Sequence, residues 1–167
     1  MKRHIIANTA LIALAAASLA ACTKPAEKAD TTKIADAVKA EVTQLIADFN
    51  AHDVAKAVSH DAPDMVGMFH GAPNIVGPEA DTAMTKQQVA DPAARIAVSD
   101  ESVDVAASGD MAVYRATYAY MMTDPATKKI VTENGNWLVG YKPQADGSWK
   151  IAWNVVSDTG AAAAAAK

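Results

Sequence analysis

Cysteine is almost missing from this sequence, with Cys22 as the single example in 167 residues. One thiol cannot form a disulfide within the chain, so a small domain held together by disulfides is excluded. A metal site would also have to form without the cluster of thiolates that structural zinc sites use. The domain therefore depends on a hydrophobic core, and the presence of Cys22 needs a separate explanation.

Basic residues are few and scattered. Their largest cluster is the pair Lys128 and Lys129, and the chain carries 15 basic against 19 acidic side chains. Removal of residues 1–21 would take two basic residues and no acidic ones, so the net charge would fall from −4 to −6. An acidic chain without a basic patch argues against nucleic acid and anionic lipid head groups as partners.

A long membrane-spanning run is also lacking. The one apolar N-terminal stretch, residues 5–21, is rich in alanine and interrupted by three polar residues, whereas a span needs about 20 strongly apolar residues. It follows Lys2 and Arg3 and ends at small residues, which is the pattern of a secretory signal peptide. We therefore expect residues 1–21 to be a signal peptide that is removed.

The segment LAAC, from Leu19 to Cys22, resembles the bacterial lipobox. The resemblance implies that the thiol receives a diacylglycerol, that the chain is cut before Cys22 and that the new amino terminus is acylated. Several acyl chains, at about 0.8 kcal/mol per buried methylene, hold a protein firmly on a membrane. Thr23 stands where aspartate would mark inner-membrane retention, so the expected location is the outer membrane of the cell envelope, facing the periplasm. The alternative is an ordinary cleavage site beside an incidental cysteine.

The rest of the chain predicts helices first and strands afterwards. Apolar positions recur at helical spacing after Lys33, where Asp30 or Thr32 could cap the helix, and Pro78 is typical of a first helical position. The predicted helices cover residues 33–49, 54–58 and 77–89. Alternating or short apolar segments bounded by turn residues predict strands. These cover residues 65–69, 95–107, 111–123, 131–141 and 149–157, with a bulge or kink rather than a hairpin at Gly135.

This order of elements predicts an α+β fold. We expect one domain over residues 33–158, in which a curved antiparallel sheet wraps around three N-terminal helices. Residues 22–32 would then be the lipidated cysteine and a flexible tether, and residues 159–167 a low-complexity tail.

Three segments carry a resemblance to a known family: FNAHDVAKAV, SGDMAVYRATY and GNWLVGYKPQADGSWKIAWNVVSD. They resemble the nuclear transport factor 2-like superfamily, especially its SnoaL-like branch of small bacterial domains. The resemblance implies a cone-shaped sheet with a pocket at its wide end. The superfamily includes ketosteroid isomerase, polyketide cyclases and dehydratases, as well as proteins that only bind or assemble.

The isomerase chemistry of this superfamily needs a tyrosine on the first helix and a carboxylate on the first strand. Leu45 occupies the position of the tyrosine, and the carboxylate position falls near Met68, Phe69 or His70. Neither catalytic side chain is present at its position. The sequence therefore argues against the steroid mechanism and leans away from an enzyme.

Histidines are the remaining candidates for chemistry. His52, His60 and His70 lie eight and ten residues apart, which is not a metal-ligand spacing, so we expect neither a metal nor a cofactor. His52 and His60 are interpreted as solvated surface residues. His70 ends a strand that should line the cone, and it is a candidate general base or a hydrogen-bonded structural histidine.

Only nine residues are aromatic, and most lie in the strand half of the chain. Tyrosine and tryptophan suit a pocket for a ligand with an apolar body and a polar edge, although core packing would also explain them. Asn136 should face away from its neighbour Trp137, and Asn154 from its neighbour Trp153. A bulge that shifts the register would change this. The predicted pocket residues are His70, Tyr118, Tyr120, Trp137 and Trp153.

Three functions remain open. The leading hypothesis is an envelope lipoprotein, anchored through lipid on Cys22, whose pocket binds a small, partly apolar molecule without transforming it. The second is an isomerase or hydrolase that uses His70 with a tyrosine donor. The third is an assembly module that forms a homodimer through the open face of its sheet.

Overall fold

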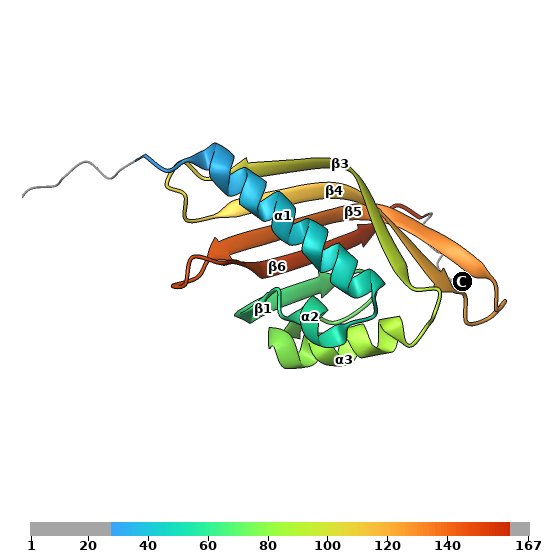
Figure 1. The fold of residues 1–167 in the computed structure, drawn as a ribbon. Coiled ribbons are helices and arrows are strands. Elements are labelled where there is room, and N and C mark those ends of the chain that lie inside the picture. Colours follow the sequence, from blue (N-terminus) through green and yellow to red (C-terminus); the bar gives the residue numbers. More distant parts are fainter. Residues whose placement is uncertain (1–27, 161–167) are drawn as a thin grey trace, which may run out of the picture.

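The computed structural model describes residues 28–160. The expected signal peptide, Cys22 and most of the expected tail lie outside the described residues. Three helices and six strands follow one another along the chain (Figure 1). They are α1 (Thr31–Asn50), α2 (Val54–Val58), β1 (Asp61–Phe69), β2 (Ile75–Val76), α3 (Gly77–Val89), β3 (Arg95–Val105), β4 (Ala112–Thr123), β5 (Ile130–Pro143) and β6 (Trp149–Asp158).

α2 and α3 begin where the sequence predicts, and α1 begins two residues earlier, at Thr31. Each start has its own signal. Asp30 accepts a hydrogen bond from the backbone N–H of Lys33, 3.0 Å away, and so caps α1. Asp53 caps α2 in the same way through Lys56, at 3.1 Å. Pro78 stands in the first turn of α3, where its missing N–H would have no helical partner.

The six strands form one sheet in the order β2-β1-β6-β5-β4-β3. The α+β class and the curved sheet with three helices are confirmed, but the sheet is mixed: β1 and β6 run parallel, and the other neighbours are antiparallel. Tight turns force antiparallel pairing along β3 to β6. No such turn joins β1 to β6, because most of the chain lies between them, and the expectation of a wholly antiparallel sheet is therefore wrong for this pair.

Gly135 lies within an uninterrupted β5, so the prediction that no hairpin forms there is confirmed. Gly135 pairs directly with Tyr118 without a bulge, and the register shift between β5 and β6 falls instead between Gly140 and Tyr141. A Cβ at position 135 would collide with the backbone oxygen of Ser157. Glycine is therefore needed at this position because two strands approach closely there.

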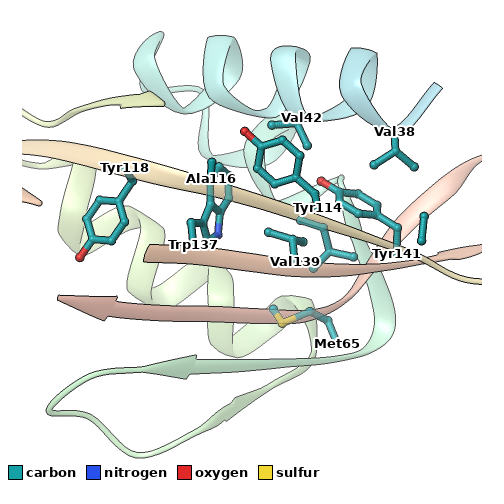
Figure 2. Close-up of a cluster of buried hydrophobic side chains, with 11 residues drawn as sticks. Val38, Val42, Met65, Tyr114, Ala116, Tyr118, Trp137, Val139 and Tyr141 are labelled. Atoms are coloured by element: carbon teal, nitrogen blue, oxygen red, sulfur yellow. The ribbon is translucent and has the colours of Figure 1, made fainter. Parts of the chain in front are cut away.

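The core lies between α1 and one face of the sheet. Val38 and Val42 of α1 are fully buried against Tyr114, Val139 and Tyr141, which alternate along β4 and β5 as the period of two predicts (Figure 2). α2 and α3 lie beside β1 at the other end of the sheet (Figure 1). The helices thus cover the inner face of the sheet at two places, and the site lies between them.

No helix within residues 28–160 combines the length and the apolar character that crossing a membrane requires.

Candidate functional site

A partly open cavity of about 310 Å³ lies between the helices and the inner face of the sheet. Its volume is at the lower end of the range for small-molecule sites, about 300–1,000 Å³. The lining is mostly apolar, with polar groups at intervals. The lining residues are Leu45, Ile46, Phe49, Ala57, Asp61, Phe69, His70, Asp81, Met84, Thr85, Gln88, Ile96, Tyr118, Tyr120, Glu133, Trp137, Ile151, Asn154 and Val156.

Four of the five residues predicted for a pocket line this cavity: His70, Tyr118, Tyr120 and Trp137. Trp153 does not, and its predicted place in the pocket is wrong. Trp153 pairs with Gly140, and its ring occupies the space that a side chain at Gly140 would fill, on the outer face of the sheet. The ammonium of Lys142 lies 4.8 Å from the centre of this ring.

Asn154 takes the inner position that Trp153 leaves. It pairs with the buried Val139, and its side-chain oxygen accepts a hydrogen bond of 2.7 Å from the indole N–H of Trp137. The expectation that Asn154 and Trp153 face opposite ways is met. This bond fixes the orientation of the Trp137 ring, which forms part of the cavity wall.

A chain of hydrogen bonds, here called the histidine chain, occupies the more exposed end of the cavity. Tyr118 donates to Glu133 at 2.6 Å, and the same carboxylate lies 3.2 Å from Nε2 of His70. Nδ1 of His70 lies 3.5 Å from a carboxylate oxygen of Asp158. Burial and the neighbouring Glu133 raise the pKa of Tyr118, so this phenol keeps its proton and remains a donor.

His70, Glu133 and Asp158 also come close enough together to be considered as metal ligands, with one atom of each within 4.8 Å of the others. However, Glu133 faces one ring nitrogen of His70 and Asp158 faces the other. A metal ion would bind only one of these nitrogens, and that side of the ring has one carboxylate. The arrangement therefore fits an imidazole held between two acceptors better than it fits a coordination sphere.

The second polar group, here called the carboxyl pair, consists of Asp61 and Asp81. Asp61 opens β1 and is 9% exposed, and Asp81 comes from α3, where it lies one helical turn before the buried Thr85. Both residues line the cavity. A hydrogen bond between the two carboxyls requires that one of them carry a proton, because an ionised carboxylate only accepts. Apart from such a proton, no donor among the described residues bonds to Oδ2 of Asp61.

Burial raises the pKa of both members of the pair. For Asp61 the next causes are the charge of Asp81 and the hydrogen bond with it, while His60 and Lys150 act weakly in the opposite direction. For Asp81, hydrogen bonds from Asp61 and Thr85 oppose the effect of burial without cancelling it. Such shifts mark functional sites more often than surface positions, because a buried charge without a partner is costly.

The carboxyl pair was not predicted from the sequence, where neither Asp61 nor Asp81 was a candidate residue. An aspartate at the start of a buried strand is a weak signal that could have indicated Asp61. Asp81 carries no such signal, because only the packing of α3 against β1 brings it to the cavity.

His60 lies outside the cavity and is not the solvated residue that we expected. It is 5% exposed and held between two carboxylates of α1, Glu41 at 2.6 Å and Asp48 at 3.0 Å. Burial lowers the pKa of His60, but the hydrogen bonds that His60 donates to these two carboxylates outweigh this effect and raise the pKa overall. His52 is half-buried, with Nε2 3.0 Å from the carbonyl oxygen of Ala94. Both histidines therefore support the fold.

Of the positions expected to carry the isomerase chemistry, Leu45, Phe69 and His70 line the cavity, and Met68 does not. None of them has the tyrosine or the carboxylate that this chemistry needs. Asp61 enters the cavity from the opposite end of β1, and Asp81 enters it from α3. The acidic groups of this pair therefore come from positions other than the expected one.

Residues 38–160 match the model of the SnoaL-like domain. No match was found among curated proteins. The fold is shared with a ketosteroid isomerase-like protein from Erwinia carotovora, with 20% identity and a TM-score of 0.63 over 75% of this chain and 96% of that one. It is also shared with an NTF2-like protein with a cystatin-like fold from Novosphingobium aromaticivorans, with 14% identity and a TM-score of 0.64 over 78% and 84%. A hexachlorocyclohexane dehydrochlorinase from Novosphingobium barchaimii has 12% identity and a TM-score of 0.65 over 75% and 86%.

Proposed function

Because the chain belongs to the family of SnoaL-like domains, we propose that its cavity binds a small, partly apolar molecule without transforming it. The observation that carries this proposal is the lining. Apolar side chains such as Leu45, Phe49 and Val156 supply surface for an apolar body, and the carboxyl pair and the histidine chain supply polar contacts. A ligand with an apolar body and a polar group at one or both ends matches this pattern.

Catalysis is the second candidate, and the histidine chain favours it. His70, Glu133 and Tyr118 form a connected set of hydrogen bonds at the cavity, in which His70 could act as a base beside a tyrosine donor. The dehydrochlorinase among the structural neighbours shows that the fold can support an enzyme. Loss of a measured turnover in His70→Ala, with binding retained, would favour this candidate over simple binding.

Native mass spectrometry tests ligand binding directly. The chain from residue 28 onward would be exported to a bacterial periplasm and purified without detergent. We expect a reproducible extra mass that Tyr118→Ala removes, because Tyr118 lines the cavity. Trp153→Ala is the matched control, since this aromatic residue lies on the outer face and should keep the extra mass. A bare mass for the unmodified protein would contradict the proposal.

We further propose that the protein is a lipoprotein of the cell envelope, held on the membrane through Cys22. The support is the LAAC segment at the end of the apolar run. Mass spectrometry of the membrane fraction should find a diacylglyceryl and acyl group on Cys22 as the mature amino terminus. Cys22→Ala should release the protein from the membrane, and an unmodified cysteine in the membrane fraction would refute the anchor.

A homodimer is the alternative that exposed apolar residues on the sheet favour. Leu138 of β5 is 41% exposed and Met121 of β4 is 40% exposed. Analytical ultracentrifugation over a hundredfold range of concentration would detect a dimer, and a strict monomer would count against assembly.

A further inference from the structure

The charges around the cavity are of one sign. Asp61, Asp81 and Glu133 contribute carboxyl groups to the lining, while none of its residues, within the part of the chain that the structure describes, is a lysine or an arginine. His70 is the one lining residue that can become cationic, and its two nitrogens already face carboxylates. A cavity with this lining attracts cations and repels anions.

Within residues 28–160 the carboxyl pair has no cationic partner. None of the ion pairs found within residues 28–160 includes Asp61 or Asp81. The nearest candidates are committed elsewhere: His60 bonds to two carboxylates of α1, and the ammonium of Lys150 bonds to the carbonyl oxygen of Ser59. Oδ2 of Asp61 is buried at the cavity, and no donor from the described part of the chain bonds to it.

Aromatic rings supply the rest of a cation site. Five lining residues are aromatic, and the faces of such rings attract cations, tryptophan most strongly. They are Phe49, Phe69, Tyr118, Tyr120 and Trp137. A lining that combines carboxyl groups with aromatic rings suits an ammonium group on an apolar body.

We infer that the ligand of this cavity is a small primary amine with an apolar body, its ammonium group seated between Asp61 and Asp81. The inference rests on the proposed function and names the chemical class of its ligand. An ammonium has three N–H donors, enough to bond both carboxyls and to supply the unpartnered Oδ2 of Asp61. A hydroxyl has one donor and no charge, so it would leave most of this acceptor capacity unused.

Binding of an amine should release a proton. Burial and Asp81 raise the pKa of Asp61, so the pair holds a proton when the cavity contains no cation. The ammonium replaces that proton and brings the charge that the pair lacks. The groups that act on the pair are His60 and Lys150, which lower the pKa of Asp61, and Thr85, which bonds to Asp81. Affinity should therefore rise with pH through neutrality and fall again when the amine itself loses its proton, near pH 10.

Three compounds with one ring separate the effect of charge from that of shape. Cyclohexylmethylamine, cyclohexylmethanol and cyclohexanecarboxylate would be titrated calorimetrically into the chain from residue 28 onward, which contains every described helix and strand. We expect the amine to bind at least tenfold more tightly than the alcohol and the carboxylate to bind least. The observed enthalpy for the amine should change between buffers of different ionisation enthalpy, because a proton leaves the protein.

Neutral variants locate the cation site. Asp61→Asn and Asp81→Asn keep the shape of the side chain and should each reduce the preference for amine over alcohol to less than threefold. Asp64→Asn is the matched control, because Asp64 lies on the same strand but is exposed and does not line the cavity. It should leave the preference unchanged.

The outcomes separate the two proposals. Equal binding of amine and alcohol, or tighter binding of the carboxylate, overturns the amine inference while the cavity remains a ligand site. Failure of all three compounds at millimolar concentration overturns the amine inference, and a bare native mass in addition overturns the proposed function. An amine preference that survives both Asp61→Asn and Asp81→Asn shows that the cation does not bind at the carboxyl pair.

Discussion

Asp61→Asn should change how the stability of the protein depends on pH. In the folded protein, burial and then the charge of Asp81 raise the pKa of Asp61 from 3.8 to about 8. A carboxyl whose pKa is higher in the folded than in the unfolded state binds more protons when folded. The stability that this group contributes is therefore lost as the pH rises from about 4 to about 8. Above about pH 8 the group causes no further change in stability. Asparagine keeps the shape of the side chain and cannot ionise, so this loss should disappear.

The size of the effect follows from the width of the pH interval. Each pH unit between the two pKa values changes the free energy of unfolding by about 1.4 kcal/mol. From pH 5.5 to about pH 8 the unmodified protein should therefore lose roughly 3 kcal/mol that Asp61→Asn does not lose. The pKa of His60 is also raised in the folded state, so stability from this group is lost as pH rises too. That loss occurs in both proteins and cancels from their difference.

Urea unfolding at pH 5.5, 7 and 9 measures this difference. The free energy of unfolding of Asp61→Asn, minus that of the unmodified protein, should increase by roughly 3 kcal/mol between the first and the last pH. Asp64→Asn should show no such increase, because its side chain is exposed. A difference that stays constant across the three pH values would refute a protonated, buried Asp61 and with it the proton release expected on amine binding.

Three further substitutions test the packing around the site by urea unfolding at pH 7. His60→Ala should lower the free energy of unfolding by about 3 kcal/mol, because two carboxylates of α1 lose the imidazole between them. A loss below about 1 kcal/mol would mean that water replaces the imidazole. Gly135→Ala should cost about 2 kcal/mol or more, since its Cβ meets a backbone oxygen of β6, and an unchanged midpoint would show that the strands can separate there. Trp137→Phe should cost about 1–2 kcal/mol through the hydrogen bond lost to Asn154, and no change would mean that this bond does not hold the ring.

Local signals made much of the fold predictable. Asp30, Asp53 and Pro78 each mark a helix start through chemistry that depends only on near neighbours in the chain. The alternation along β4 placed Tyr114 and Tyr118 on the buried face in the same way. These features were predicted because the residues that decide them are close together in the sequence.

The site was less predictable, because its parts come from distant segments. Asp61 and Asp81 belong to different elements, and only the start of a buried strand at Asp61 gives a weak local signal for either of them. Similarly, His70 meets Glu133 and Asp158 only because β6 lies between β1 and β5 in the sheet. The position of Trp153 was wrong for a related reason, since its face is set by the pairing with Gly140 and the register shift beside it.

The position of β6 between β1 and β5 also affects when the sheet can form during synthesis of the chain. β6 is the last of the described strands to be synthesised. Because it joins β1 to β5, the complete sheet can form only after residues 149–158 have been made. Until then β1 and β5 present open edges, and Ile151 and Val156 are missing from the cavity wall. Contacts of such long range slow folding, and a chain interrupted before residue 149 would carry both halves of the sheet without the strand that joins them.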